Sequence, residues 1–221
     1  MINSLQEDCS MRRSVLLMIV AGLMLMSACS DPAADKTKAV TGEATQVASP
    51  AAAAQGQRYL ITPQNSKIEF VGSKVTGSHN GSFGDFSGQI DHVGAPDQGR
   101  VTITIKADSL TTDTPDLTKH LKTADFFDVA KFPEASFVST SIKPGGENGA
   151  SHTVTGNLTL HGVTKAVTFP ATISVTPDVA SVDSTFSINR KDFGINYAGQ
   201  ADNLIRDNVV LKLTIRATKA S

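Results

Sequence analysis

Tryptophan is absent from the 221-residue chain, and cysteine occurs only twice, as Cys9 and Cys29. Neither cysteine lies in the part of the sequence that has the pattern of a folded domain. That domain therefore has no internal disulfide, no thiol nucleophile and no thiolate metal site. An excess of charge is also lacking, because the formal net charge is -1 with acids and bases interspersed. No basic face is available to neutralise phosphates, so we expect no nucleic-acid partner.

The short motifs of common enzyme sites are missing as well. The sequence has no GxSxG nucleophile elbow and no HExxH zinc motif, and Gly77 is not followed by the lysine of a phosphate-binding loop. The histidines show no paired spacing for a metal. We expect no catalytic residue, no metal site and no resident cofactor. An unrecognised hydrolase or redox enzyme would need His120 or His161 to converge with carboxylates.

The first 28 residues have the features of a secretory signal peptide. Met11–Arg13 opens a positive region, and Ser14–Met26 is an almost unbroken apolar run. The run is too short to cross a bilayer of about 30 Å, which needs about 20 residues. The residues before Met11 are polar and include two acids. We hypothesise that translation starts at Met11 and that residues 1–10 are not part of the protein made in the cell.

The residues around Cys29 resemble a bacterial lipobox, since Met26-Ser27-Ala28-Cys29 fits at three of four positions. The resemblance implies that Cys29 is diacylated and becomes the mature N-terminus, and two acyl chains give stable anchoring. Ser30 follows the cysteine, which resembles the pattern of outer-membrane lipoproteins. We therefore expect a periplasmic protein that is lipid-anchored to the outer membrane through Cys29. An ordinary secretory peptide with a chance cysteine is the alternative.

Residues 29–57 form the predicted lipidated N-terminus and a flexible tether. From Ser30 to Gln57 the chain is rich in Ala, Thr, Pro, Ser, Gln, Lys and Asp, and it has scarcely a large apolar residue. Such a segment buries too little apolar surface to order itself. The sequence thus predicts that one folded domain occupies residues 58–221.

The domain is predicted to be all-β, because apolar and polar residues alternate with a period of two between clusters of Gly, Pro and Asx. Val209, Leu211, Leu213 and Ile215 give the clearest case. About eight antiparallel strands with one apolar face must either stack as two sheets or close into a barrel. The candidate strands are Lys67–Val75, Ser82–His92, Val101–Ala107, Ala135–Lys143, Thr153–Leu160, Val167–Val175, Val182–Asn189 and Val209–Ala217.

One segment breaks the strand pattern. Leu117 and Leu121 have helical spacing within Asp116–Lys122, with Asp116 as the candidate cap. Neighbouring phenylalanines flanked by acids follow in Asp125–Asp128. We expect one or two short helices here, lying across a barrel mouth or edge.

Five stretches of the sequence carry a family resemblance: Gly81–Gly88, His120–Asp128, Phe132–Phe137, Thr155–Lys165 and Arg190–Gly194. In this order, and spanning nearly all of residues 59–219, they resemble the YceI-like family of periplasmic polyisoprenoid-binding proteins. The resemblance implies an antiparallel lipocalin-like closed barrel that encloses a long prenyl or fatty chain. It also implies a homodimer by analogy with other members.

Large apolar side chains are the candidate ligand-binding residues, because each can line a cavity; ordinary core packing is the alternative for any one of them. They are Phe83, Phe86, Phe126, Phe127, Phe137, Leu158, Phe169, Phe186 and Phe193. Four polar residues are candidates for the mouth or for a ligand headgroup: His120, Asn157, His161 and Arg190. Arg190 could instead bond loop carbonyls or pair with Asp192 or Asp207, and a structural role is equally open to the histidines.

These features predict non-catalytic binding or transport of a long-chain isoprenoid or similar amphiphile, such as a quinone, a prenyl phosphate or a fatty acyl chain, in the bacterial envelope. Burial of the chain would drive uptake, and polar residues at the mouth would set its orientation. The expected partners are this apolar ligand and, through Cys29, the membrane. The alternative is an interaction or stress-response module whose barrel is filled by its own side chains.

Overall fold

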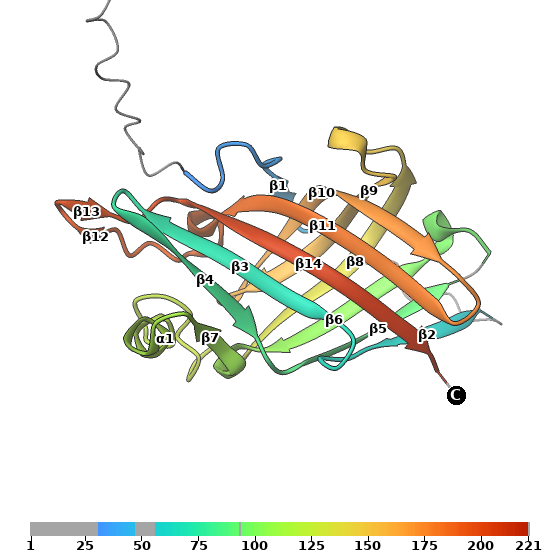
Figure 1. Ribbon diagram of the computed structural model, residues 1–221, viewed down its shortest axis with the longest axis horizontal. Coiled ribbons are helices and arrows are strands. Elements are labelled where there is room, and N and C mark those ends of the chain that lie inside the picture. The colour runs from blue at the N-terminus through green and yellow to red at the C-terminus, as the bar shows by residue number, and fades with distance from the viewer. Residues whose placement is uncertain (1–30, 47–55, 93, 221) are drawn as a thin grey trace, which may run out of the picture. The chain divides into compact units, whose positions relative to one another are not determined.

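An antiparallel β-barrel dominates the computed structural model, which describes residues 31–46, 56–92 and 94–220 (Figure 1). Eight strands form the ring, each paired with the next, and the last pairs with the first. In ring order they are β2 (Gln57–Ile61), β5 (Phe86–His92), β6 (Arg100–Lys106), β8 (Glu134–Pro144), β9 (His152–Leu160), β10 (Val163–Val175), β11 (Val179–Asn189) and β14 (Asn208–Lys219). The predicted all-β closed barrel is thereby confirmed.

One end of the barrel carries additional elements. β14 pairs with β2 only at Thr218 and Lys219, and over Val210 to Thr214 its partner is β3. β3, β4 and β7 continue the sheet in that order, and helix α1 follows β7. In Figure 1 this end lies at the left, with α1 and the β12–β13 hairpin, whereas β2 and the C-terminus lie at the right. The bounds are β3 (Lys67–Lys74), β4 (Gly77–Phe83), β7 (Leu110–Thr112), α1 (Pro115–Leu121), β12 (Gly199–Gln200) and β13 (Asn203–Leu204).

Short 3-10 helices make four of the connections within the described residues. They are η1 (Pro96–Gln98), η2 (Ala107–Ser109), η3 (Glu147–Gly149) and η4 (Arg190–Phe193). No helix in the described part of the chain is long and apolar enough to cross a membrane.

The alternating residues of the long strands point to the barrel interior as expected. Buried side chains form three clusters along it. The cluster at the α1 end contains Phe70, Leu121 and Phe126. A second cluster contains Phe169 and Phe186, whose rings stack 4.2 Å apart. The third is the β2 cluster: Tyr59, Ile61, Ile68, Phe86, Ile90, Ile103, Ala180, Ile215 and Ala217.

Two local predictions need correction. The expected strand Ser82–His92 is two strands, because β4 pairs with β3 and β7 whereas β5 pairs with β2 and β6, and the chain bends between them at Gly84 and Asp85. The expected helix is present as α1, but its N-cap is Thr114, and Asp116 lies in the first turn. An acid in that turn still interacts favourably with the helix dipole.

The segment 31–46 also differs from the predicted tether, because it is bound to the barrel; we call it the N-terminal strap. Within it β1 (Val40–Glu43) pairs antiparallel with β10. The N–H of Ala39 donates to the carbonyl of Ser187 at 2.8 Å, and the N–H of Ser187 donates to the carbonyl of Thr37 at 2.9 Å. The strap thus bridges β10 and β11, which pair with each other only from Thr172 to Val175 on β10.

The amino-acid composition of residues 31–46 does not predict an ordered strap, because backbone hydrogen bonds, and not large apolar side chains, hold most of it to the barrel. Ala39 is 4% exposed and packs in the Phe169 cluster, where a small side chain fits against two strands. The predicted tether also extends too far at its C-terminal end, because Gln57 already begins β2. Residues 47–55 of the tether, Cys29, Ser30 and the predicted signal peptide lie outside the described residues.

Candidate ligand-binding cavity

A cavity of about 600 Å³ occupies the barrel interior. Apolar side chains from the long strands make up most of its wall, so most of the lumen offers no hydrogen-bond partner to a guest. Seven of the nine predicted ligand-binding residues line it: Phe83, Phe126, Phe127, Phe137, Leu158, Phe169 and Phe186. Their role in binding stays a prediction that this position supports.

The other two predicted residues do not reach the cavity. Phe86 is 3% exposed and belongs to the β2 cluster. Phe193 is fully buried beside Val167 and Phe169. Both are core residues, because each is almost fully buried within a cluster of apolar side chains and neither lines the cavity.

Several lining residues were not named as candidates from the sequence. Phe70 and Leu211 lie on adjacent strands at paired positions, and Tyr197 comes from the loop before β12. Leu211 could have been selected from the alternation of β14, which already placed it on the apolar face. Tyr197 has no such signal, because it lies outside the periodic segments.

Two glycines keep the lumen open. A Cβ at Gly81 would lie 2.1 Å from Cζ of Phe70, and one at Gly156 would lie 2.3 Å from Cζ of Phe137. Both distances are far below van der Waals contact. The phenylalanine rings therefore lie flat against the bare backbone of the neighbouring strand, where a side chain would push them into the cavity.

Polar lining residues gather at one end of the cavity, which we call the mouth. They come from the β3–β4 hairpin, α1, η4 and the segment around β12 and β13: Ser73, Lys74, His79, His120, Arg190, Gln200, Asn203 and Arg206. The predicted mouth residue His120 is among them. Its Nε2 lies 2.8 Å from Oδ2 of Asp125. Its ring packs edge-on against the rings of Phe126 and Tyr197, with ring centroids 5.1 and 5.3 Å apart. The predicted helix thus lies at the barrel mouth.

Asn157 and His161 are not at the mouth. Asn157 is bound to the strap, with its Nδ2 donating to the carbonyl of Thr45 at 2.6 Å and its Oδ1 accepting from the N–H of Thr45 at 3.0 Å. His161 occupies the β9–β10 turn with φ of 52°, and its ring packs on Phe132 at 4.6 Å. Its Nδ1 lies 3.3 Å from the carbonyl oxygen of Phe193. Neither residue lines the cavity, so neither can meet a headgroup there.

Arg190 bonds loop carbonyls, the first of its two alternatives. Its side chain is 5% exposed, and its guanidinium donates to the carbonyls of Ile195, Ile205 and Arg206 at 2.7, 3.3 and 3.1 Å. Nη2 also lies 3.5 Å from Asp207. Burial lowers the pKa of Arg190, and Asp207 opposes that shift. The arginine ties together the two ends of the loop that forms one side of the mouth.

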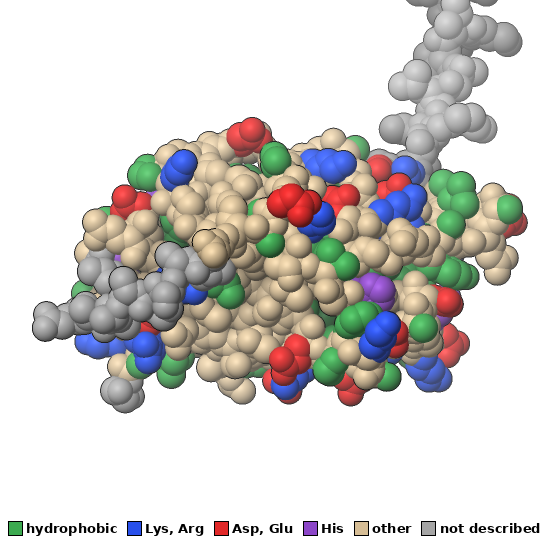
Figure 2. Space-filling model, turned by 180° about the vertical axis from the view of Figure 1, so that it is seen from behind, with side chains coloured by type: hydrophobic (Ala, Val, Ile, Leu, Met, Phe, Trp, Pro, Cys, Tyr) green, Lys and Arg blue, Asp and Glu red, His purple; other side chains and the backbone are tan. Residues whose placement is uncertain are grey.

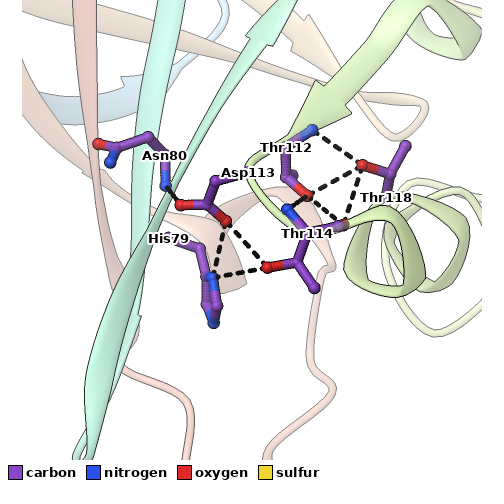
Figure 3. A network of polar contacts seen from close by, with 6 residues as sticks. All are labelled: His79, Asn80, Thr112, Asp113, Thr114 and Thr118. Carbon is purple, nitrogen blue, oxygen red and sulfur yellow. Dashed lines mark hydrogen bonds and ion pairs between the residues drawn. The ribbon is translucent and has the colours of Figure 1, made fainter.

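A polar network holds β4 to β7 and to the start of α1 (Figure 3). Asp113 is its centre, because its carboxylate accepts from the backbone N–H of Asn80 at 2.8 Å and faces Nδ1 of His79 at 2.8 Å. The hydroxyls of Thr112 and Thr118 bond each other at 2.9 Å alongside. The network fixes the position of His79, a residue of the mouth.

The network should make stability depend on pH. The Asn80 N–H, and then His79, lower the pKa of Asp113. A carboxyl with a lower pKa in the folded chain stabilises the fold above its unfolded pKa, about 3.9, and loses that contribution as pH falls through the folded pKa. Asp113→Asn is therefore expected to reduce the free energy of unfolding at about pH 7 and to reduce it less below about pH 4.

Urea unfolding at a series of pH values measures this effect. Asp116→Asn is the matched control, since its side chain is 93% exposed on α1, where its interactions with Lys119 and the helix dipole are worth about 1 kcal/mol or less. A cost for Asp113→Asn that is the same at every pH would contradict the assignment.

Within the described residues, no group of three or more His, Cys, Asp or Glu side chains is placed to hold a metal ion. A second, shallower hollow of about 280 Å³ lies outside the barrel between the strap and the β8–β9 connection, and its lining is largely polar. The apolar barrel cavity is therefore the candidate binding site.

Comparison with known proteins agrees with this geometry. Residues 59–217 match the model of the YceI-like domain. A UPF0312 protein of Pseudomonas putida strain W619 is 42% identical over 127 residues, which make up 54% of this chain and 65% of the relative. The match thus spans just under two thirds of the length of that relative.

Solved structures share the barrel. BcnA of Burkholderia cenocepacia superposes with a TM-score of 0.61 at 28% identity, covering 72% of this chain and 99% of BcnA. A polyisoprenoid binding domain from Saccharophagus degradans has a TM-score of 0.59 at 17% identity, covering 75% of this chain and all of that domain. The second likeness concerns the fold alone. The family match, which extends over most of the barrel, establishes that this chain belongs to the YceI-like family.

Proposed function

We propose that the protein binds a long-chain isoprenoid or a similar amphiphile inside its barrel, without catalysis, and carries or sequesters it in the bacterial envelope. The observation that carries the proposal is one apolar cavity whose polar residues are confined to the mouth. A chain entering it leaves water at a gain of about 0.8 kcal/mol per methylene, against the cost of ordering the chain. The Saccharophagus degradans domain is a polyisoprenoid binding domain, which supports the same ligand class.

Most charges at the mouth are already matched, which favours an uncharged headgroup over a diphosphate; among the described mouth residues Lys74 is the exception, and it supplies one positive charge against the several negative charges of a diphosphate. His79 faces Asp113, His120 faces Asp125 and Arg206 faces Asp31, so these three side chains are each matched by an acid. The guanidinium of Arg190 donates its hydrogen bonds to loop carbonyls, and not to a headgroup. A quinone or a prenyl alcohol needs only hydrogen bonds, which Gln200, Asn203 and the histidines can provide.

The setting in the cell is part of the proposal. The secretory signal and the lipobox-like residues before Cys29 support export and acylation, and Ser30 supports the outer membrane as the destination. The homodimer stays a prediction of the family resemblance.

Native mass spectrometry followed by organic extraction tests the proposal on the full chain produced in a bacterial envelope. We expect a bound species of prenyl or acyl mass. Adding an isoprenoid quinone to delipidated protein should raise Tm, because a ligand that binds only the folded state stabilises it. Protein that carries no lipid, and whose Tm does not respond to isoprenoid quinones, prenyl alcohols or fatty acids, would point instead to the interaction module.

A further inference from the structure

Two exposed aliphatic side chains meet beside the mouth. Val75 and Leu204 are 47% and 49% exposed, and they belong to the four large hydrophobic residues that are exposed in the described part of the chain. The N–H of Val75 donates to the carbonyl of Leu204 at 3.1 Å, so the β3–β4 turn and β13 lie against each other. Lys74, which precedes Val75, and Ile205, which follows Leu204, both line the cavity. We call Val75 and Leu204 the mouth rim.

Hydrophobic side chains are visible at this end of the molecule in the space-filling view. It is the right-hand end of Figure 2, which is turned by 180° from Figure 1. Charges of both signs lie near the rim: the bases Lys74 and Arg206, and the acids Asp31 and Asp202, the last exposed in the β12–β13 turn. Charge therefore does not select the partner of the rim, and its protruding side chains are apolar.

The N-terminal strap begins at the same place. Oδ2 of Asp31 lies 3.4 Å from Nη1 of Arg206, and the backbone N–H of Arg206 donates to the carbonyl of Ser73 at 2.8 Å. Arg206 follows Leu204 by two residues, and Ser73 precedes Val75 by two. The described chain thus starts beside the rim. Cys29, the predicted acylation site, precedes Asp31 by only two residues, a length of at most about 7 Å when extended.

We propose that the mouth rim docks on a lipid bilayer, so that the cavity opens onto the membrane surface. The inference rests on the proposed function, because a hydrocarbon chain that passes between a bilayer and the cavity must cross the rim. Three features meet at this end: the polar end of an apolar lumen, two protruding aliphatic side chains and the start of the segment predicted to be anchored. Two side chains bind weakly in free solution, but an acyl anchor at Cys29, two residues before Asp31, would give the rim a high effective concentration at the bilayer.

Tryptophan fluorescence can test the docking directly, because the chain has no tryptophan and each variant carries a single reporter. Val75→Trp and Leu204→Trp place it on the rim. Leu60→Trp is the matched control, since Leu60 is 43% exposed on β2, at the opposite end of the barrel (Figure 1). Each full-length variant is extracted from a bacterial envelope and reconstituted into phosphatidylcholine vesicles whose acyl chains are brominated.

The bromines quench only an indole that reaches the acyl region. We expect about twofold lower emission from both rim variants than in unbrominated vesicles, as for side chains that sit at the headgroup and acyl boundary, and no change for Leu60→Trp. Raising the salt concentration should leave the quenching unchanged. Absence of quenching at the rim, or equal quenching at all three positions, overturns the proposal. A blue shift of the rim variants that depends on protein concentration without vesicles would also overturn it, because the rim would then contact a second copy.

The same preparations separate this proposal from the carrier function. Organic extraction and mass spectrometry report the bound lipid, and Tm reports folding of each variant. Bound lipid without rim quenching contradicts docking alone. Rim quenching with an empty cavity that no added isoprenoid quinone fills contradicts the carrier function alone.

Discussion

Replacing Leu211 with tryptophan is expected to weaken retention of a long-chain ligand more than tenfold while the barrel stays folded. Leu211 lines the cavity between two aromatic residues on the same wall, because its register partners on the flanking strands are Phe70 on β3 and Phe186 on β11. It packs against both the α1-end cluster and the Phe169 cluster, so it lies on the path from the mouth inward. Excluding even two methylenes of the ligand from the lumen removes about 1.6 kcal/mol of binding free energy. That loss already lowers the affinity by more than a factor of ten.

Lys212→Trp is the control for this experiment. Lys212 is the next residue of β14, and its side chain is 57% exposed on the outer face, where it faces Glu69. Quantitative extraction of the co-purified lipid and the ligand-induced change in Tm should be as in the wild type for Lys212→Trp and sharply reduced for Leu211→Trp. A Leu211→Trp protein that retains its full complement of long-chain lipid would mean that the chain does not occupy this cavity.

Replacing Arg190 with methionine is expected to lower the free energy of unfolding by about 3–5 kcal/mol. The substitution keeps an apolar stem of similar length but leaves the carbonyls of Ile195, Ile205 and Arg206 without this donor, at about 1–3 kcal/mol for each one that stays unpaired. That cost is a large part of the 5–15 kcal/mol that holds a typical domain together. The mouth loop should also open before the barrel, since Arg190 joins its two ends.

Urea denaturation measures the total loss, and hydrogen exchange of residues 195–206 reports on the loop. Lys191→Met is the matched control, because Lys191 is half exposed and pairs with Asp207 at the surface, where an ion pair is worth about 1 kcal/mol or less. Arg190→Lys should recover only part of the stability, since an ammonium cannot reach three carbonyls in the geometry of a planar guanidinium. Equal losses for the two methionine variants would refute the role assigned to Arg190.

Strand alternation predicted the barrel wherever a strand is long and has one buried face. Val209, Leu211, Leu213 and Ile215 all line the cavity, as the sequence of β14 predicts. The short elements could not be predicted in this way. β12 and β13 have two residues each, which is too short for a period, and β1 is held mainly by its backbone.

The candidate site was predictable in its apolar part and largely not in its polar part. Periodicity identifies inward-facing residues but does not distinguish the lumen from packed core, which explains why Phe86 does not line the cavity. Phe193 lies in η4, outside the alternating segments, so the strand pattern could not place it. The mouth forms because Lys74, His120 and Arg206, which are far apart in the sequence, come together in the fold. Asn157 was misassigned because its partner is the strap, whose position the composition of residues 29–57 does not reveal.

The place of β14 in the sequence determines when, during folding, the barrel cavity is closed. This strand is the last of the described strands, and it pairs with β11 along its length and with β3 and β2 on its other side. A chain that is still being made therefore has seven strands of the ring but no closed wall, and its pairings across the longest sequence separations form last. Only when the twelve residues of β14 have paired does the lumen have a complete boundary, so the cavity can enclose a lipid only after this strand has closed the ring.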